Sequence, residues 1–176
     1  MKRASGIVFT LALAFAPLSC KRDRTVHVQQ TEEEAPRLAS VVHVSDPKVA
    51  PQLVSGFYGI EANAWRWTAK HFTVILRVPS GAAQRGATLD LALTVPAVTI
   101  EKLKSVSLTA SVDGHPLPPE TYTHSGAFHL KRDVPADLLT NQSVKVEFQL
   151  DKVMPPSNGD MRELGIIVGS IGLEAK

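Results

Sequence analysis

The chain has 176 residues, 44% of them hydrophobic and 20% charged, which is enough for one domain with an apolar core. Its formal charge of +2 comes from Lys2 and Arg3 at the start, so the remainder is neutral and lacks a basic stripe, which argues against nucleic acid as a partner. A single cysteine, Cys20, excludes an internal disulfide.

The first residues have the organisation of a bacterial export signal. Lys2 and Arg3 precede an apolar run over residues 7–16, and small residues follow it. The run is shorter than the roughly 20 apolar residues that a membrane-spanning helix needs. We therefore predict a signal peptide over residues 1–19.

Cys20 stands where such a signal would be cut. Leu18-Ser19-Cys20 resembles a lipobox, in which the cysteine receives a lipid, although Pro17 occupies the position where leucine is usual. The sequence therefore predicts lipidation of Cys20 and a lipid-anchored protein of the bacterial cell envelope. Lys21 is not the aspartate associated with inner-membrane retention, which favours the outer membrane in a Gram-negative cell. The alternative is a plain secretory signal and a secreted or periplasmic protein.

Residues 20–37 form the next segment. They contain a basic cluster at 21–24, an acidic run at 32–34 and Pro36, with few apolar side chains to bury. Such a composition does not offset the entropy of ordering the chain, so we predict a flexible tether. The folded domain is then expected over residues 38–176.

The dominant pattern of this domain is a period of two. In residues 143–151, Val144, Val146, Phe148 and Leu150 alternate with polar residues, as in a half-buried antiparallel strand. The same pattern predicts strands at 38–44, 64–69, 72–78, 89–95, 106–112, 127–131 and 164–173. The segment 164–173 is apolar on both faces, which indicates a central strand.

Turn residues separate these segments. Asp113-Gly114 is the strongest hairpin signal, although Pro116, Pro118 and Pro119 interrupt the strand that should follow. No segment has a sustained helical period, and residues 134–139 could form one short turn. About eight strands spaced by turns predict an all-β fold, an antiparallel, jelly-roll-like β-sandwich, with an open barrel as the alternative.

The segment with both tryptophans is the main candidate site. In a strand, Trp65 and Trp67 share one face and Arg66 points to the other. One hypothesis makes Arg66 and Trp67 structural anchors, with Arg66 paired to Glu61 and to Asp160. The other makes the indoles an exposed platform that stacks on sugar rings. The small number of aromatic residues favours the anchors.

Other chemistry is not indicated. The six histidines show no metal-ligand spacing, so we expect no metal and no cofactor. Asp160, Arg162 and Glu163 could offer carboxylates for acid–base work, but a carboxylate–arginine clamp that holds a loop is commoner. Nucleophile and phosphate-loop motifs are missing from the sequence, so we expect no enzyme activity.

Two blocks carry a family resemblance: GFYGIEANAWRWT near the start of the domain and LDKVMPPSNGDMRELGIIVGSIGLE at its end. Together they resemble a family of small bacterial β-sandwich domains, some joined to cell-surface polysaccharide enzymes (glycosyltransferases). The likeness spans about residues 53–173, and it implies a β-sandwich but no settled function. The matching motif positions are Gly56, Glu61, Arg66, Trp67, Asp160, Arg162 and Gly165.

Two hypotheses for the function follow from these observations. The first is a non-catalytic envelope lipoprotein that binds glycan or polysaccharide through residues 56–68. The second is a structural or assembly lipoprotein that binds another envelope protein through its β-sandwich. In both, the membrane is reached through the N-terminal lipid.

Overall fold

A computed structural model describes residues 38–157 and 159–176. The predicted signal peptide, Cys20 with its lipid and the tether at 20–37 lie outside these residues, so they stay predictions. Within the described part, no helix is long and apolar enough to cross a membrane.

Strands make up most of the regular structure in the described chain, as the alternating pattern predicts. Every strand pairing is antiparallel, which confirms the all-β class. The strands are β1 (Val41–His43), β2 (Leu53–Glu61), β3 (Trp65–Arg77), β4 (Ala87–Val95), β5 (Val106–Val112), β6 (His115–Tyr122), β7 (Gly126–Val134), β8 (Ser143–Leu150) and β9 (Ile167–Ala175). Four short helical segments join them: η1 (Pro47–Gln52), α1 (Ala82–Arg85), α2 (Ala97–Leu103) and η2 (Ala136–Leu139).

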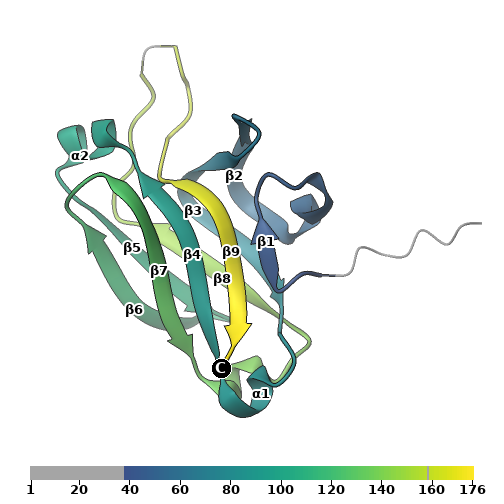
Figure 1. The fold of residues 1–176 in the computed structure, drawn as a ribbon. Helices are drawn as coiled ribbons and strands as arrows, with labels where there is room; N and C mark the ends of the chain where they lie inside the picture. Colours follow the sequence, from purple (N-terminus) through teal and green to yellow (C-terminus); the bar gives the residue numbers. More distant parts are fainter. Residues whose placement is uncertain (1–37, 158) are drawn as a thin grey trace, which may run out of the picture. The chain divides into compact units, whose positions relative to one another are not determined.

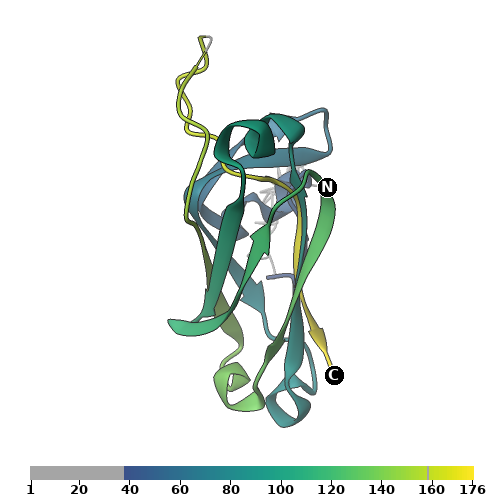
Figure 2. The same cartoon turned by 90° about the vertical axis from the view of Figure 1, so that its left-hand side faces the viewer.

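The strands form a sandwich of two layers (Figure 1). One layer has the order β1–β9–β4–β7 and the other β2–β3–β8–β5–β6, and Figure 2 shows them from the side. The pairs β3–β8, β4–β7 and β5–β6 are nested, as in a jelly roll. Strand β3 belongs to both layers, because its start pairs with β9 and its second half, from His71 on, pairs with β8.

The core lies between the layers and is filled by the inward residues of each strand. In β4, buried and partly exposed residues alternate along the whole strand, from Ala87 to Val95. The rings of Phe72 and Phe148, on neighbouring strands β3 and β8, stack with their centroids 4.7 Å apart. The predicted sandwich is therefore confirmed, with nine strands in the described chain where about eight were expected.

The additional strands lack a clean period of two. Strand β2 has three register shifts against β3, and Gly56 in it has a φ of +76°. A Cβ atom on Gly56 would lie 2.0 Å from the His71 carbonyl oxygen, so only glycine fits at position 56 of this irregular strand. The segments expected at 64–69 and 72–78 form one continuous strand, β3. The sequence pattern is interrupted there because polar Arg66 and Lys70 occupy inward positions of the strand.

The proline-rich strand β6 was also missed. Among the described strands it pairs with β5 alone, so it lies at the edge of its layer, where prolines cost few ladder hydrogen bonds. The hairpin predicted at Asp113-Gly114 is present, and both residues have positive φ, +47° and +85°, as a type I′ turn requires. Helices α1 and α2 are too short to leave a recognisable helical period.

Candidate functional site

The two sequence blocks of the family resemblance meet in space. Trp67 in β3 is opposite Ile167 in β9, and the Thr68 amide donates to the Ile166 carbonyl over 2.9 Å. The Gly165 amide donates to the Thr68 carbonyl over 2.7 Å. A Cβ atom on Gly165 would lie 2.6 Å from the Thr68 hydroxyl oxygen, so glycine permits this close approach. The start of β3 is therefore built against the chain that leads into β9.

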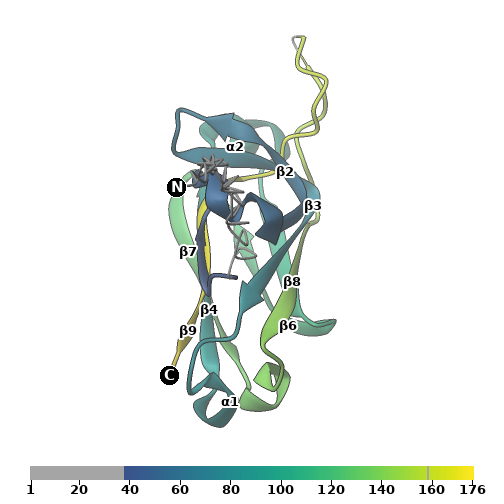
Figure 3. The same ribbon diagram turned by 90° about the vertical axis from the view of Figure 1, so that its right-hand side faces the viewer.

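Before β9 the chain projects from the end of the sandwich beside the β2–β3 hairpin (Figure 3). We call residues 151–157 and 159–166 the arm. Its two sides are joined by main-chain bridges between Met154 and Leu164 and between Ser157 and Asp160. At its base the Tyr58 hydroxyl donates to the Glu163 carbonyl over 2.9 Å. The arm is thus tied to strand β2.

Arg162 is the centre of an ion cluster in the arm. Its Nη2 lies 2.8 Å from Asp160 Oδ2, and its Nη1 lies 2.9 Å from Glu61 Oε1. The guanidinium also lies over the Tyr58 ring, 5.2 Å from the centroid. Hydrogen bonds from Arg162 lower the pKa of Asp160 to about 2. Of the residues expected to form a carboxylate–arginine clamp, Asp160 contacts Arg162, and Glu61 from β2 supplies the second carboxylate in place of Glu163.

The partners of Arg66 in the structure differ from the predicted ones, Glu61 and Asp160. Its Nε donates to the Val44 carbonyl and its Nη1 to the Tyr58 carbonyl, each over 2.7 Å, whereas the carboxylates of Glu61 and Asp160 bind Arg162. Glu61 is opposite Trp65 in the ladder, and cross-strand partners share a face. The Glu61 carboxylate therefore lies on the tryptophan side of the strand, away from Arg66.

The tryptophans lie at the start of β3, on the outer face of the layer that contains β9. Trp67 shares a face with its partly exposed partner Ile167, whereas Val168, the partner of Arg66, is fully buried. Neither indole belongs to the buried core, and both are partly exposed. The two rings meet edge to face with centroids 6.2 Å apart. This placement favours the exposed platform for the tryptophans and leaves the anchoring contacts to Arg66.

An open hollow of about 270 Å³ lies beside Trp65 on this face, and we call it the tryptophan hollow. Trp65 and Ile167 line one side and His129 the other, and small residues lie between them: Ala92, Thr94, Ala127 and Gly169. A Cβ atom on Gly169 would meet nothing within 4 Å, so the space above it is open. The surface can therefore accept a flat, ring-shaped group against the indole.

Polar groups border the tryptophan hollow. His129 Nδ1 lies 2.7 Å from Asp90 Oδ1, and Lys131 Nζ lies 3.5 Å from the second oxygen of the same carboxylate. The His129 side chain is 59% exposed and the Asp90 side chain 16%. One side of the hollow is thus apolar and aromatic, and the other offers hydrogen-bonding groups.

Most residues of the tryptophan hollow could not be predicted from the sequence. They come from β3, β4, β7 and β9, and none of them forms a motif along the chain. The one available signal was the outer face of the segment 89–95, where small Ala92 and Thr94 follow Asp90. Only the order of the strands brings this face beside Trp65.

No family model and no curated protein sequence matches this chain. Similar solved structures include a family 35 carbohydrate binding module from Clostridium thermocellum, 12% identical, with a TM-score of 0.48, covering 77% of this chain and 98% of that one. Another is the family GH115 4-O-methyl-alpha-glucuronidase BtGH115A, 12% identical, with a TM-score of 0.43, covering 95% of this chain and 20% of that one. A third is the structure of the CBM51-2 (in complex with GlcNAc) and INT domains of Clostridium perfringens ZmpB, which is 14% identical. Its TM-score is 0.38, and the match covers 78% of this chain and 28% of that one. They say nothing of what this chain binds.

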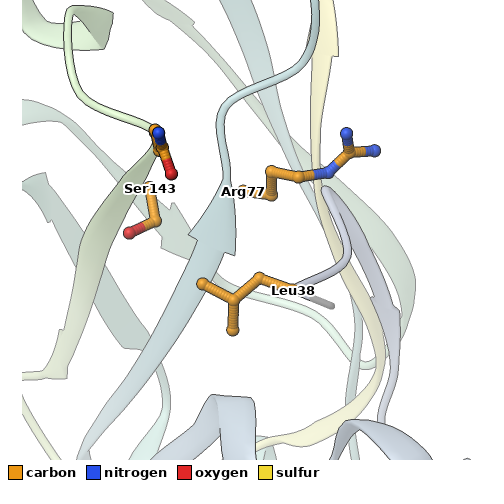
Figure 4. A pocket seen from close by; sticks show the side chains of 4 residues that line it. Leu38, Arg77 and Ser143 are labelled. Carbon is orange, nitrogen blue, oxygen red and sulfur yellow. The ribbon is translucent and has the colours of Figure 1, made fainter. Parts of the chain in front are cut away.

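A further hollow, of about 610 Å³, lies where the described chain begins. Leu38, Arg77, Gln142 and Ser143 line it, and Figure 4 shows the Arg77 guanidinium turned away from Ser143. Few side chains of the described residues converge there, so this hollow offers less for a ligand than the tryptophan hollow. Among the described residues, no three His, Cys, Asp or Glu side chains gather as metal ligands would.

Proposed function

We propose that this protein is a non-catalytic glycan-binding module that holds a sugar ring in the tryptophan hollow. The observation that carries the proposal is the position of Trp65, whose partly exposed indole lies on the outer face of the sheet beside an open hollow. Sites for small ligands combine apolar or aromatic walls with a few polar groups that fix orientation.

The chemistry of a sugar suits this arrangement. A pyranose ring has an apolar C–H face, which packs on an indole, and a rim of hydroxyl groups, which needs hydrogen-bonding partners. The small side chains of Ala92 and Ala127 and the missing side chain of Gly169 let the ring approach the sheet. His129 lines the polar side, and because its Nδ1 is bonded to Asp90, its second ring nitrogen is the one that can meet a hydroxyl group.

The proposal includes an envelope location. A lipid on Cys20 would hold the module at a membrane surface, the outer membrane in a Gram-negative cell, since each buried CH₂ contributes about 0.8 kcal/mol. The tether at residues 20–37 would let the sandwich reach glycans beyond that surface. Mass spectrometry of the mature N-terminus tests this: a diacylglycerol-modified Cys20 is expected, and an unmodified cysteine or cleavage elsewhere contradicts it.

One observation favours a second candidate, a structural or assembly role. Met161 in the arm is 83% exposed, the largest fraction among the exposed large apolar side chains of the described residues. A partner protein of the envelope could bind this end of the sandwich. Capture of a partner by the parent but not by a Met161→Asp variant would favour this role.

The glycan proposal is tested by filling the hollow. Gly169→Val adds a side chain into open space in strand β9, where valine is well tolerated. Gly59→Val is a matched control, because Gly59 also lies in a strand with nothing within 4 Å of an added Cβ atom. Both variants should keep the parent melting temperature.

The measurement is binding to an array of bacterial and plant polysaccharides, followed by calorimetry with the best oligosaccharide. We expect Gly169→Val and Trp65→Ala to weaken binding by about tenfold or more, and Gly59→Val to bind like the parent. If the parent binds no glycan, the proposed function is wrong. If Gly169→Val binds like the parent, the site is wrong.

A further inference from the structure

The opposite layer of the sandwich has a hollow of its own. It measures about 360 Å³ and lies over β3, β8 and β5, on the outward face of the layer that does not contain β4 and β7. We call it the polar groove. Its side chains are His71, Thr73, Thr109, Ser111, Glu147 and Gln149, with Pro116 at one border.

The register of the strands places these side chains in two rows. His71 is opposite Gln149, which is opposite Thr109, and Thr73 is opposite Glu147, which is opposite Ser111. Residues directly opposite each other point to the same face with their Cβ atoms about 5 Å apart. The two rows therefore run side by side across three strands, like a grid of hydrogen-bonding groups.

Few of these groups bond to other described residues. Thr109 donates to the Gln149 main-chain carbonyl over 3.2 Å, and Glu147 pairs with Lys145 over 3.0 Å. Within residues 38–157 and 159–176, the side chains of His71, Thr73, Ser111 and Gln149 make no hydrogen bond to the protein. Several donors and acceptors in the groove thus have no partner in the described part of the chain and can meet a ligand.

The composition of the groove differs from that of a merely solvated strand. The outer face of β7 carries His129, Lys131 and Asp133, long or charged side chains of the usual kind. In the polar groove most side chains are short or neutral, and its one carboxylate, Glu147, is already paired with Lys145. Short hydroxyl side chains keep the surface hollow and leave room for a ligand to reach them.

We propose that the polar groove is a second ligand site, for a neutral, polyhydroxylated ligand, namely a segment of a neutral oligosaccharide. A ligand of this class can match many neutral donors and acceptors at once and needs no balancing charge. Stacking is not available here, because Phe148, the aromatic residue beneath the groove, is 2% exposed and faces the core. Recognition would rest on side-chain hydrogen bonds alone.

This site would add to the tryptophan hollow. The two lie on outward faces of opposite layers, so one molecule could hold two glycan segments. Two weak sites engaged at once give a higher apparent affinity for a polymer than either site alone. The inference does not depend on the tryptophan hollow, because no residue is shared between the two.

The test is an NMR titration of the parent and of Gly169→Val with neutral gluco-, manno- and galacto-oligosaccharides. We expect amide shifts at residues 71–73, 109–111 and 147–149 in both proteins, because Gly169→Val fills only the tryptophan hollow. Thr73→Val and Gln149→Leu, which keep the side-chain shape, should weaken this binding by about tenfold. Thr88→Val, on the outer face of β4 and outside both hollows, is the matched control and should bind like the parent.

The inference is overturned if no neutral oligosaccharide shifts these amides, or if Thr73→Val and Gln149→Leu bind like the parent. Matching uronate-containing oligosaccharides test the ligand class, and a preference for them would contradict a neutral ligand. Loss of shifts around Trp65 alone in Gly169→Val, with the groove shifts kept, separates the two sites. If the tryptophan hollow binds no glycan, the shifts around Trp65 are absent from the parent and those in the groove remain.

Discussion

Glu61 and Arg162 are 101 residues apart in the sequence, and their side chains meet over 2.9 Å between Oε1 and Nη1. The contact joins strand β2 to the arm. Because Arg162 also binds Asp160 within the arm, a single guanidinium holds the shape of the arm and its position on the sandwich. The first and last parts of the domain are thus fastened together beside the tryptophans.

We expect Arg162→Ala to loosen the arm without unfolding the domain. The ion pairs are about a third exposed and screened by solvent, so the melting temperature should fall by no more than about 4 °C. Amide hydrogen exchange at 160–166 should rise clearly. Glu163→Gln is the control, since Glu163 contributes its main-chain carbonyl to Tyr58. Unchanged exchange in Arg162→Ala would show that the arm is held by other contacts.

The arm should also loosen in acid. Hydrogen bonds from Arg162 lower the pKa of Asp160 from 3.8 to about 2, so the folded protein binds this proton less readily than the unfolded chain does. The stabilisation is complete above about pH 4 and is lost as the pH falls through about 2. Hydrogen exchange of the arm followed from pH 5 to 2 should show this loss. Asp160→Asn should remove that pH dependence, and a parent-like profile in this variant would assign the loss to another group.

Arg66→Ala should destabilise the fold. Arg66 joins β3 to the Val44 and Tyr58 carbonyls, and each hydrogen bond from a charged group contributes about 1.5–3 kcal/mol. A loss of about 3 kcal/mol is a large part of the 5–15 kcal/mol typical of a domain. Urea unfolding should show it as a lower midpoint at constant m-value. A midpoint equal to that of the parent would reject the anchoring role.

Trp67→Ala, by contrast, should cost less than Arg66→Ala. The Trp67 indole lies on the outer face and is absent from the buried core, so its truncation leaves no internal cavity. The hypothesis that Arg66 and Trp67 are both structural anchors predicts a large loss for each variant, and the same unfolding curves test it. A midpoint for Trp67→Ala as low as that for Arg66→Ala would restore Trp67 as an anchor.

The fluorescence of Trp65 should report ligand binding in the tryptophan hollow. In a Trp67→Phe variant the remaining indole is that of Trp65, which is partly exposed, so its emission should be red-shifted. A bound sugar ring should change its intensity in a saturable way. Filling the hollow with Gly169→Val should abolish that change. Blue-shifted emission that does not change when any oligosaccharide is added would instead favour a protein partner.

The sequence by itself determined the class of fold, because strand alternation is a local property. Residues 143–151 and 106–112 alternate strictly, and both are strands with buried apolar faces. The turn at Asp113-Gly114 was equally predictable, since both residues must adopt positive φ. The contact between Asp160 and Arg162 is local too, as only two positions separate them.

Tertiary structure decided everything that depends on which strands become neighbours. Alternation places Trp65 and Arg66 on opposite faces, but it does not say which face meets the core, and pairing of β3 with β9 turned the indole outward. The pairing of β2 with β3 placed Glu61 on the side of Trp65, within reach of Arg162. Both hollows arise from side chains of three or more strands, and their assembly follows from strand order, which no local pattern encodes.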